Sequence, residues 1–565
     1  MRDDVKTTIA KLINIDGVSQ EEVKSLLVTP PDPKMGDLSL PCFKFAKALR
    51  KSPVIIAQEL AESIALPDGV AEVSALNGYL NFRLDKNAEA KKVLSEVMKQ
   101  GAKYGGSEEG MGKTICIDYS SINIAKPFHI GHLLTTVIGG SLYRIYEKLG
   151  YKCVGINHLG DWGTQFGKLI VAFKKWCSEE ILAERGMKVL TEIYVKFHEE
   201  AEKDPALNDE ARAYFKKIED NDTEATRLFN LFKEVTLREV QKTYKRLKIT
   251  FDSYNGEAFY NDKMQPIIDE LNKKGLLIES EGAKVVDLSE YNMPPCLIVK
   301  ADGATLYATR DLAAAHYRKA TYDFHKSLYV VAYQQNLHFK QVFKVLELMG
   351  KDWAKDMVHV PFGMVSLEDG AMSTRKGKVV LLEDVLNKAV EKSLDIITQK
   401  NPDLEDKEQV AETVGVGAVI FSALYNNRIK DMVFSYDKVL SFDGETAPYV
   451  QYTVARCKSV MRKVGDIDLS KADFDGLKNE ESEAVISALS KFNEVIRSAA
   501  EKYEPCYVAR YLVELCREYN RFYLNNRITN EVEGIKIVRA ALTDAVRTVL
   551  EEGLYLLGIS APERM

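Results

Sequence analysis

The feature that most constrains the fold is a strand, a polar turn and a helix in immediate succession. Thr114–Tyr119 (TICIDY) is a mostly apolar, β-prone run, as expected for a buried parallel strand. After the turn SSINIAKP, Phe128–Leu149 is predicted to form one long helix, and Tyr151–Ile156 is again strand-like. This pattern predicts a βαβ unit, and in open α/β sheets ligands bind at the carboxyl ends of the strands.

The chain of 565 residues is far too long for one hydrophobic core, and its length suggests roughly three to five domains. Residues 1–110 are predicted to form a small α+β domain. In this region Ser52–Ala65 has a Ser N-cap, Pro just inside it and apolar positions at helical spacing. Leu80, Phe82 and Leu84 alternate with other residues, as in a strand.

Residues 111–413 are predicted to form an α/β domain with a Rossmann-type parallel sheet. From about 171 to 292 the sequence is helical and strongly charged, which indicates an insertion that decorates this sheet. Strand signals return at Leu297–Val299 and Ser327–Ala332. Residues 414–565 are predicted to form an all-α bundle. Its expected helices are Tyr449–Lys463, Glu483–Tyr503, Cys506–Asn525 and Ile535–Leu557.

Charge and composition exclude some classes of protein. The net charge of −6 argues against a general nucleic-acid coat, although local basic patches remain possible. Eight scattered cysteines form no C-x-x-C pair, so we expect reduced thiols and no structural zinc. No apolar run spans a bilayer, and the first residues lack a signal core, so we expect a cytoplasmic protein without membrane contact. A monomer is the default expectation.

A pair of histidines stands at the start of the predicted helix after the first strand. His129 and His132 in HIGH lie at i and i+3, on one face of the first turn, where free N–H groups and the helix dipole favour an anion. Gly131 removes a side chain, so a flat base can approach the backbone. These residues predict a nucleotide site, and the alternative is two ordinary surface histidines.

The segment AKPFHIGH at Ala125–His132 resembles the HIGH signature of class I aminoacyl-tRNA synthetases, in the form found in the arginyl-tRNA synthetase family. The wider segment SSINIAKPFHIGH is also similar, although Ile122 stands where Pro is usual. Further similar segments follow in the family's order, and the resemblance covers nearly the whole chain. They are NHLGDWGTQFG at Asn157–Gly167, DGATLYATRDLAAAHYR at Asp302–Arg318, QQNLHFKQVF at Gln334–Phe343, MSTRKGKVV at Met372–Val380 and FDGETAPYVQYTVAR at Phe442–Arg456.

The resemblance implies an arginine–tRNA ligase that uses ATP with Mg²⁺. The amino-acid carboxylate attacks the α-phosphorus, so the protein supplies positioning and charge rather than a nucleophile. Lys126, His129 and His132 are then the candidates for holding the phosphates, and Gly131 joins the two histidines in binding ATP. Lys126 could instead be a solvated lysine at the start of a helix.

A second cationic element is expected at MSTRKGK, where the wider class carries KMSKS. In KMSKS, one Lys precedes the Met-Ser pair and another follows it. In this chain Ala371 precedes Met372 and Ser373, and Thr374 follows them. The predicted roles are therefore catalytic for Arg375 and Lys376, and ATP binding for Met372 and Ser373. Without the resemblance, a solvated basic loop would be as good an interpretation of this segment as a phosphate-binding one.

A guanidinium presents a planar fork of donors, and carboxylates and neutral acceptors match it. By similarity to the family, the arginine-binding positions are Asp118, Asn123, Tyr307, Asp311 and Gln335. Lysine would leave these acceptors unpaired, so no editing domain is required. For Asp311 the alternative is an acid placed near a helix start by the dipole.

The helical C-terminal region resembles the family's anticodon-binding domain, and the N-terminal module resembles the one that contacts the tRNA elbow. Tyr449 and Tyr452 could stack on bases of tRNA(Arg), beside Arg456, although such tyrosines are more often core residues. One rival hypothesis is another enzyme of the same superfamily. A second is a non-catalytic tRNA-binding paralogue, which would be expected to lack the histidine pair or the pocket acids.

Overall fold

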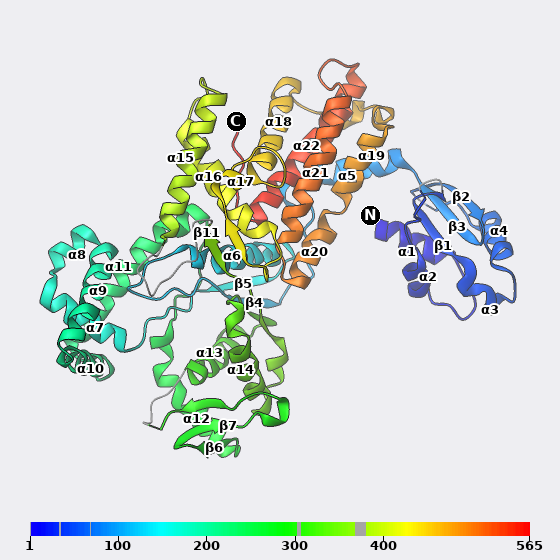
Figure 1. The fold of residues 1–565 in the computed structure, drawn as a ribbon. Helices are drawn as coiled ribbons and strands as arrows, with labels where there is room; N and C mark the ends of the chain where they lie inside the picture. Colours follow the sequence, from blue (N-terminus) through cyan, green and yellow to red (C-terminus); the bar gives the residue numbers. More distant parts are fainter. Residues whose placement is uncertain (1, 33–34, 68, 302–306, 368–379) are drawn as a thin grey trace. The chain divides into compact units, whose positions relative to one another are not determined.

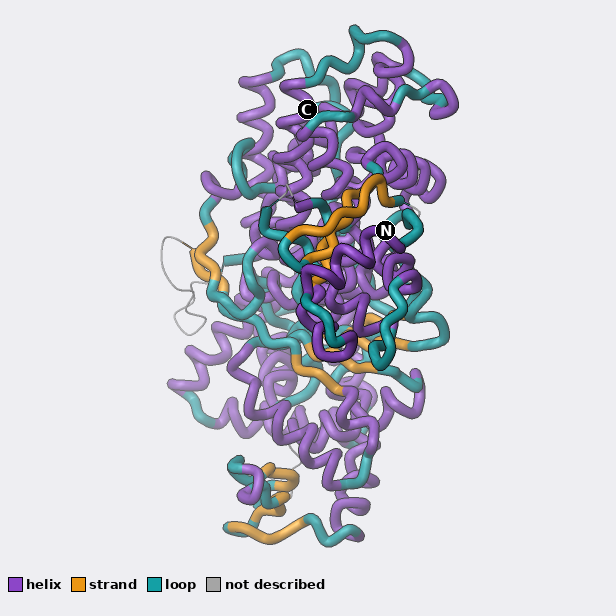
Figure 2. Tube along the Cα trace, turned by 90° about the vertical axis from the view of Figure 1, so that its right-hand side faces the viewer, coloured by secondary structure: helices purple, strands orange, loops and turns teal. Residues whose placement is uncertain are grey.

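The computed structural model describes residues 2–32, 35–67, 69–301, 307–367 and 380–565 (Figure 1). Two compact units can be distinguished in it. Unit 1 contains Met1–Tyr104, Arg456–Asn493 and Glu514–Leu550, and unit 2 contains Gly105–Ala455, Glu494–Val513 and Glu551–Met565. Helices form most of the trace, and the strands gather in small groups (Figure 2). None of the described helices is long and apolar enough to cross a membrane.

The N-terminal module of unit 1 confirms the predicted α+β architecture. Its antiparallel sheet has the order β1-β3-β2, with β1 at Leu38–Pro41, β2 at Val70–Leu76 and β3 at Tyr79–Leu84. Leu80, Phe82 and Leu84 of β3 are buried, as their alternation predicts. The helices are α1 Arg2–Leu12, α2 Gln20–Leu26, α3 Ala46–Leu49, α4 Pro53–Ser63 and α5 Lys86–Gln100.

The C-terminal region is helical, as predicted. Its helices are α18 Ala447–Val464, α19 Glu480–Ser490, α20 Phe492–Lys502, α21 Cys506–Asn525 and α22 Glu533–Leu556. The prediction of one helix over Glu483–Tyr503 was wrong, because α19 and α20 are separate. The amide of Lys491 bonds to the carbonyl of Ala488, three residues back, and this tighter turn ends α19.

The centre of unit 2 is a parallel sheet with the order β10-β9-β4-β5. Its strands are β4 Thr114–Asp118, β5 Lys152–Ile156, β9 Lys326–Tyr329 and β10 Met357–His359. Asp118, the last residue of β4, pairs in register with Ile156 and Tyr329, the last residues of its two neighbours. The carboxyl ends of these three strands therefore form one edge, and the predicted βαβ unit is confirmed.

The helix of this βαβ unit begins later than predicted. His129 is extended (φ −108°, ψ 168°) and caps a short 3₁₀ turn, η4 Ile130–His132, and α6 Leu133–Lys148 follows. Phe128 and His129 are thus outside the helix. Buried residues of α6 include Ser141, whose hydroxyl donates to the carbonyl of Leu556 at 2.9 Å.

The remaining elements of unit 2 surround this sheet. Leu297–Val299 forms a strand, but within a separate antiparallel sheet of order β6-β7-β8 rather than in the parallel sheet. The other strands are β6 Leu277–Ser280, β7 Ala283–Val286, β8 Cys296–Val299, β11 Val365–Leu367 and β12 Met432–Phe434. The other helices are α7 Thr164–Trp176, α8 Glu179–Arg185, α9 Met187–Lys203, α10 Ala206–Glu219, α11 Thr223–Leu247, α12 Met264–Lys273, α13 Tyr307–Tyr322, α14 Asn336–Leu348, α15 Leu382–Lys400, α16 Lys407–Tyr425 and α17 Tyr436–Val439.

Candidate active site

The turn between β4 and η4 has an unusual backbone. Ser120, Ser121 and Ala125 all have positive φ, at 67°, 45° and 59°, although each carries a Cβ. Side chains other than glycine visit this region at a cost, and such residues cluster at functional sites where the surroundings hold them. The turn therefore has a shape that its own sequence does not favour.

Helix α11, from the charged insertion, holds this turn in place. The hydroxyl of Thr236 accepts a hydrogen bond from the amide of Ala125 at 3.1 Å. The hydroxyl of Tyr244 lies 2.7 Å from the Ser120 hydroxyl and accepts a hydrogen bond from Asn157 at 2.9 Å. Sequence reasoning did not find this role for the insertion, since an apolar or hydroxyl residue on an amphipathic helix gives no signal of its partner.

The two histidines lie side by side, with ring centroids 4.1 Å apart. Nδ1 of His129 accepts a hydrogen bond from the amide of Gly131 at 3.1 Å, and Nδ1 of His132 lies 3.2 Å from the amide of His129. Only the Nε2 atoms are left for a ligand. Because an accepting Nδ1 carries no proton, neutral His129 carries its proton on Nε2 and can donate it to an anion.

Both histidines are held neutral at pH 7. Burial, with the nearby charge of Lys126, lowers the pKa of His129. Burial and then the neighbouring His129 lower the pKa of His132 to about 3. Neutral His129 is thus a hydrogen-bond donor beside a neutral His132, whereas Lys126, which is exposed, supplies the fixed positive charge of this segment.

Asp118 ends β4 and lies under a buried cation that the sequence did not reveal. Its Oδ2 accepts a hydrogen bond from Nη2 of Arg318 at 2.7 Å, and its Oδ1 accepts one from the Ser121 hydroxyl. The Arg318 side chain is 1% exposed and its guanidinium lies over the Tyr329 ring, 5.3 Å from the centroid. Asp118 is therefore already paired within the protein.

Asp311 lies on α13, one turn after Tyr307, as predicted. Its Oδ2 lies 2.5 Å from Nε2 of His338 on α14. Burial acts to raise the pKa of Asp311, but the hydrogen bond and charge of His338 outweigh it and lower that pKa. Asp311 is consequently ionised at neutral pH, and its second oxygen carries no protein hydrogen bond among the described residues.

Glu257, at the start of the short 3₁₀ turn Glu257–Lys263, is a further acid of this site that sequence reasoning missed. Burial raises its pKa to about 7, against the charge of Arg310, whose Nη1 lies 3.8 Å from Oε2 of Glu257. The neighbouring carboxylates of Asp311 and Asp161 raise it further. Perturbed acids of this kind concentrate at functional sites, but a lone Glu after a glycine has no distinguishing sequence signal.

The remaining predicted arginine-binding residues are exposed at the same edge of the sheet. Asn123 follows β4 and forms an isolated bridge with Gly160, after β5. Gln335 follows β9 and caps α14, and Tyr307 begins α13 with 67% of its surface exposed. The pair of Asp118 with Arg318 links β4 to α13, and the pair of Asp311 with His338 links α13 to α14. The five predicted residues therefore belong to linked elements.

Four predicted residues, Met372, Ser373, Arg375 and Lys376, lie outside the described residues. The chain that follows them is fixed beside the histidines. The amide of Ile130 donates to the carbonyl of Val380 at 3.1 Å, and His129 forms an isolated bridge with Leu381.

The three residues predicted to contact tRNA lie on α18, outside this site. Tyr449 is partly buried, and Tyr452 is 42% exposed. Nη1 of Arg456 donates to Asn520 at 2.5 Å, and its guanidinium lies 5.0 Å from the centroid of the Tyr523 ring. Of these three residues, Tyr452 offers the largest exposed aromatic surface.

The arrangement combines donors for an anion with acceptors for a cation. The neutral imidazoles and Lys126 belong to one turn, and the carboxylates of Asp311 and Glu257 are close enough to each other, and Lys126 to Glu257, for their charges to shift the pKa of Glu257. Within the described ranges, no cluster of three or more His, Cys, Asp or Glu side chains could hold a metal ion. The site is thus suited to bringing a phosphate and a cationic molecule together without a protein nucleophile.

Comparisons with known proteins agree along the whole chain. The family model described as tRNA synthetases class I (R), catalytic domain, matches residues 93–436. The family model described as arginyl tRNA synthetase N terminal domain matches residues 1–84. The family model described as DALR anticodon binding domain matches residues 450–565. Relatives named arginine–tRNA ligase from Alkaliphilus metalliredigens and Halothermothrix orenii are 52% and 51% identical over 564 residues, covering 100% of both chains in each case.

Solved structures are similar as well. The arginyl-tRNA synthetase of Thermus thermophilus has a TM-score of 0.76 at 26% identity, over 95% of this chain and 96% of that one. The arginyl-tRNA synthetase of Plasmodium falciparum has a TM-score of 0.77 at 23% identity, over 100% of this chain and 98% of that one, a likeness of fold.

Proposed function

The chain belongs to the arginyl-tRNA synthetases of class I, and from that premise we propose how its described residues divide the work of an arginine–tRNA ligase. The enzyme activates L-arginine with ATP to arginyl-adenylate and pyrophosphate, and transfers the arginine to tRNA. ATP enters as its magnesium complex, and the tRNA is tRNA(Arg). The observation that carries the assignment of residues is the neutral histidine pair together with the partly buried acids Asp311 and Glu257.

His129 and His132 stabilise the negative charge that builds on the triphosphate as the arginine carboxylate attacks the α-phosphorus. Their Nε2 atoms donate hydrogen bonds, and a donor already aimed at the developing charge needs no reorganisation during the reaction. Lys126 adds a full positive charge on the same segment. The roles expected for Arg375, Lys376, Met372 and Ser373 stay predictions from the resemblance.

The guanidinium of the substrate binds to Asp311 and Glu257. Both are acids of the same group, and each keeps an oxygen without a protein hydrogen bond among the described residues. Tyr307 and Gln335 close the pocket from the exposed side, and Asn123 takes part from the turn. We assign Asp118 a positioning role next to this pocket, because its oxygens are paired with Arg318 and Ser121.

The α18 surface around Tyr452 is proposed to take part in tRNA(Arg) binding, with Tyr449 and Arg456 supporting it. An exposed ring can stack on an unpaired base, whereas Arg456 is already engaged by Asn520 and the Tyr523 ring. Tyr452→Ala should therefore weaken tRNA binding, and Tyr452→Phe should leave it nearly unchanged. Equal binding of both variants would exclude a stacking role.

The overall proposal is tested by charging purified tRNA with each amino acid in turn. We expect arginine alone to be transferred, and pyrophosphate exchange to require tRNA, as the resemblance to the family implies. His129→Asn removes a donor and should slow the reaction by 10²–10³, about the cost of one lost transition-state donor. Transfer of another amino acid, or no transfer at all, would overturn the assignment.

A further inference from the structure

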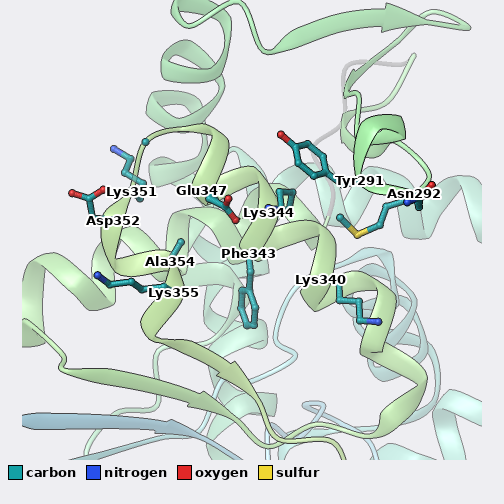
Figure 3. Close-up of a pocket in the computed structure, with 12 residues that line it drawn as sticks. Tyr291, Asn292, Lys340, Phe343, Lys344, Glu347, Lys351, Asp352, Ala354 and Lys355 are labelled. Atoms are coloured by element: carbon teal, nitrogen blue, oxygen red, sulfur yellow. Dashed lines mark hydrogen bonds and ion pairs between the residues drawn. The ribbon is translucent and has the colours of Figure 1, made fainter.

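A basic groove lies on the face of α14 that points away from the active site. His338 of α14 faces Asp311. Because successive residues of a helix are rotated by about 100°, residues 340, 344 and 347 lie on the opposite side of α14. The groove has a volume of about 780 Å³ and is formed by α14, the loop at residues 291–293 and residues 350–355 (Figure 3). We call it the lysine groove after four of its lining residues: Lys340, Lys344, Lys351 and Lys355.

The charges of the lysine groove do not balance. Lys344 is paired with Glu347 at 2.6 Å, and Lys351 is paired with Glu270 at 2.9 Å. Lys340 and Lys355 are exposed and have no acidic partner within 4.0 Å among the residues that the structure describes. Asp352 also lines the groove and has no basic partner within 4.0 Å among the described residues. Four lining lysines thus stand against two lining acids, Glu347 and Asp352, and the groove keeps a net positive charge in a chain whose net charge is −6.

The floor of the groove is partly apolar. Phe343 and Met293 pack against the core of this region, and Ala354 is buried. The Tyr291 ring is 40% exposed, with Nζ of Lys344 4.5 Å from its centroid. A surface of ammonium groups beside aromatic and thioether groups suits a nucleic-acid strand, whose phosphates are joined by sugars that carry bases, better than it suits a simple anion.

The groove runs along the helix that follows Gln335, on the face opposite the active site. At a rise of about 1.5 Å per residue, Lys340 lies only about 7.5 Å along the α14 axis from Gln335, and Glu347 about 18 Å. We propose that the lysine groove binds the phosphodiester backbone of the bound tRNA, on the face of α14 opposite the active site. This inference rests on the proposed function, because it takes tRNA as the substrate.

The double variant Lys340→Ala with Lys355→Ala tests the groove. The matched control is Lys152→Ala, an exposed lysine at the amino end of β5, on the opposite edge of the parallel sheet. The tRNA dissociation constant is measured by filter binding from 50 to 200 mM salt. Two lost phosphate contacts should lower the slope of log Kd against log salt by about 1.5 to 2, so the defect should shrink about tenfold over that range.

In steady-state charging, the double variant should raise the KM for tRNA and leave the KM for arginine and for ATP unchanged. Replacement of both lysines by Arg should restore binding, because Arg keeps the charge. Wild-type binding and slope in the double variant would overturn the inference, as would an equal defect in the control. The inference would also be overturned if inorganic pyrophosphate bound to the wild type and not to the double variant, while both proteins bound tRNA equally. If the wild-type enzyme itself charges no tRNA(Arg), the proposed function fails instead.

Discussion

Removal of the Arg318 guanidinium should destabilise unit 2 strongly. The substitution Arg318→Met keeps most of the buried volume but leaves the carboxylate of Asp118, a residue 6% exposed, with Ser121 as its remaining side-chain hydrogen-bond partner among the described residues. Breaking a buried ion pair from one side costs about 3–5 kcal/mol, because the other charge stays buried without compensation. We expect a loss in this range.

Tryptophan fluorescence during urea unfolding measures this loss, because all three tryptophans, Trp162, Trp176 and Trp353, belong to unit 2. The matched control is Lys392→Ala, whose pair with Asp437 has the same 2.7 Å distance but an 88% exposed carboxylate. An exposed pair of this kind contributes little to stability, because solvent screens its charges.

The double variant Arg318→Met with Asp118→Leu gives the decisive comparison. If the cost comes from an unpaired buried charge, removing that charge as well should restore most of the lost stability. A loss below about 1 kcal/mol in Arg318→Met would refute the reasoning, and so would a double variant that is no more stable than Arg318→Met. Either result would mean that the buried pair between Asp118 and Arg318 does not carry the stability assigned to it.

Three further predictions concern the site itself. Lys126→Ala should lower kcat by about 10²–10³ with little change in the KM for arginine, and a change mainly in KM would remove Lys126 from transition-state binding. Because the pKa of Glu257 is raised to about 7, kcat/KM for arginine should fall about tenfold per pH unit below pH 7. Glu257→Gln should abolish this decrease at low pH. The same decrease in the variant would contradict the assignment. Folding lowers the pKa of His132 to about 3, so the folded state binds fewer protons than the unfolded state between pH 6.5 and 3. Stability is therefore complete above pH 6.5 and should decline by up to about 1.4 kcal/mol per pH unit below it, and His132→Asn should show a shallower decline in urea midpoints than the wild type.

Local patterns in the sequence predicted much of this architecture. The apolar run Thr114–Tyr119 predicted a buried parallel strand, which the structure has at Thr114–Asp118, and i, i+4 spacing placed Tyr307 and Asp311 on one turn of α13. The ion pair between Asp118 and Arg318 joins residues 200 positions apart, and periodicity carries no information about such a partner. The spacing of seven residues from Asp311 to Arg318 does place them on one helix face, which is the one signal that could have drawn attention to Arg318.

The start of the helix after the turn was misplaced for a different reason. Pro127 is common in a first helical turn, and this preference favoured a start before the histidines. In the structure His129 is extended, and its ring and that of His132 interact with the backbone amides of the turn. Side-chain capping by histidine is outside the usual set of N-cap residues, so propensity could not predict it.

The partners of α6 have a consequence for synthesis of the protein on the ribosome. The hydroxyl of Ser141 is bonded to Leu556, 415 positions later, and Lys148 is paired with Glu552 at 2.8 Å. At about 5–20 residues per second, translation needs about 20–80 s to reach these partners after α6 has been made. During that time the helix that follows the histidines lacks part of its packing, so nascent chains should depend on chaperones, and the active site should be completed late in translation.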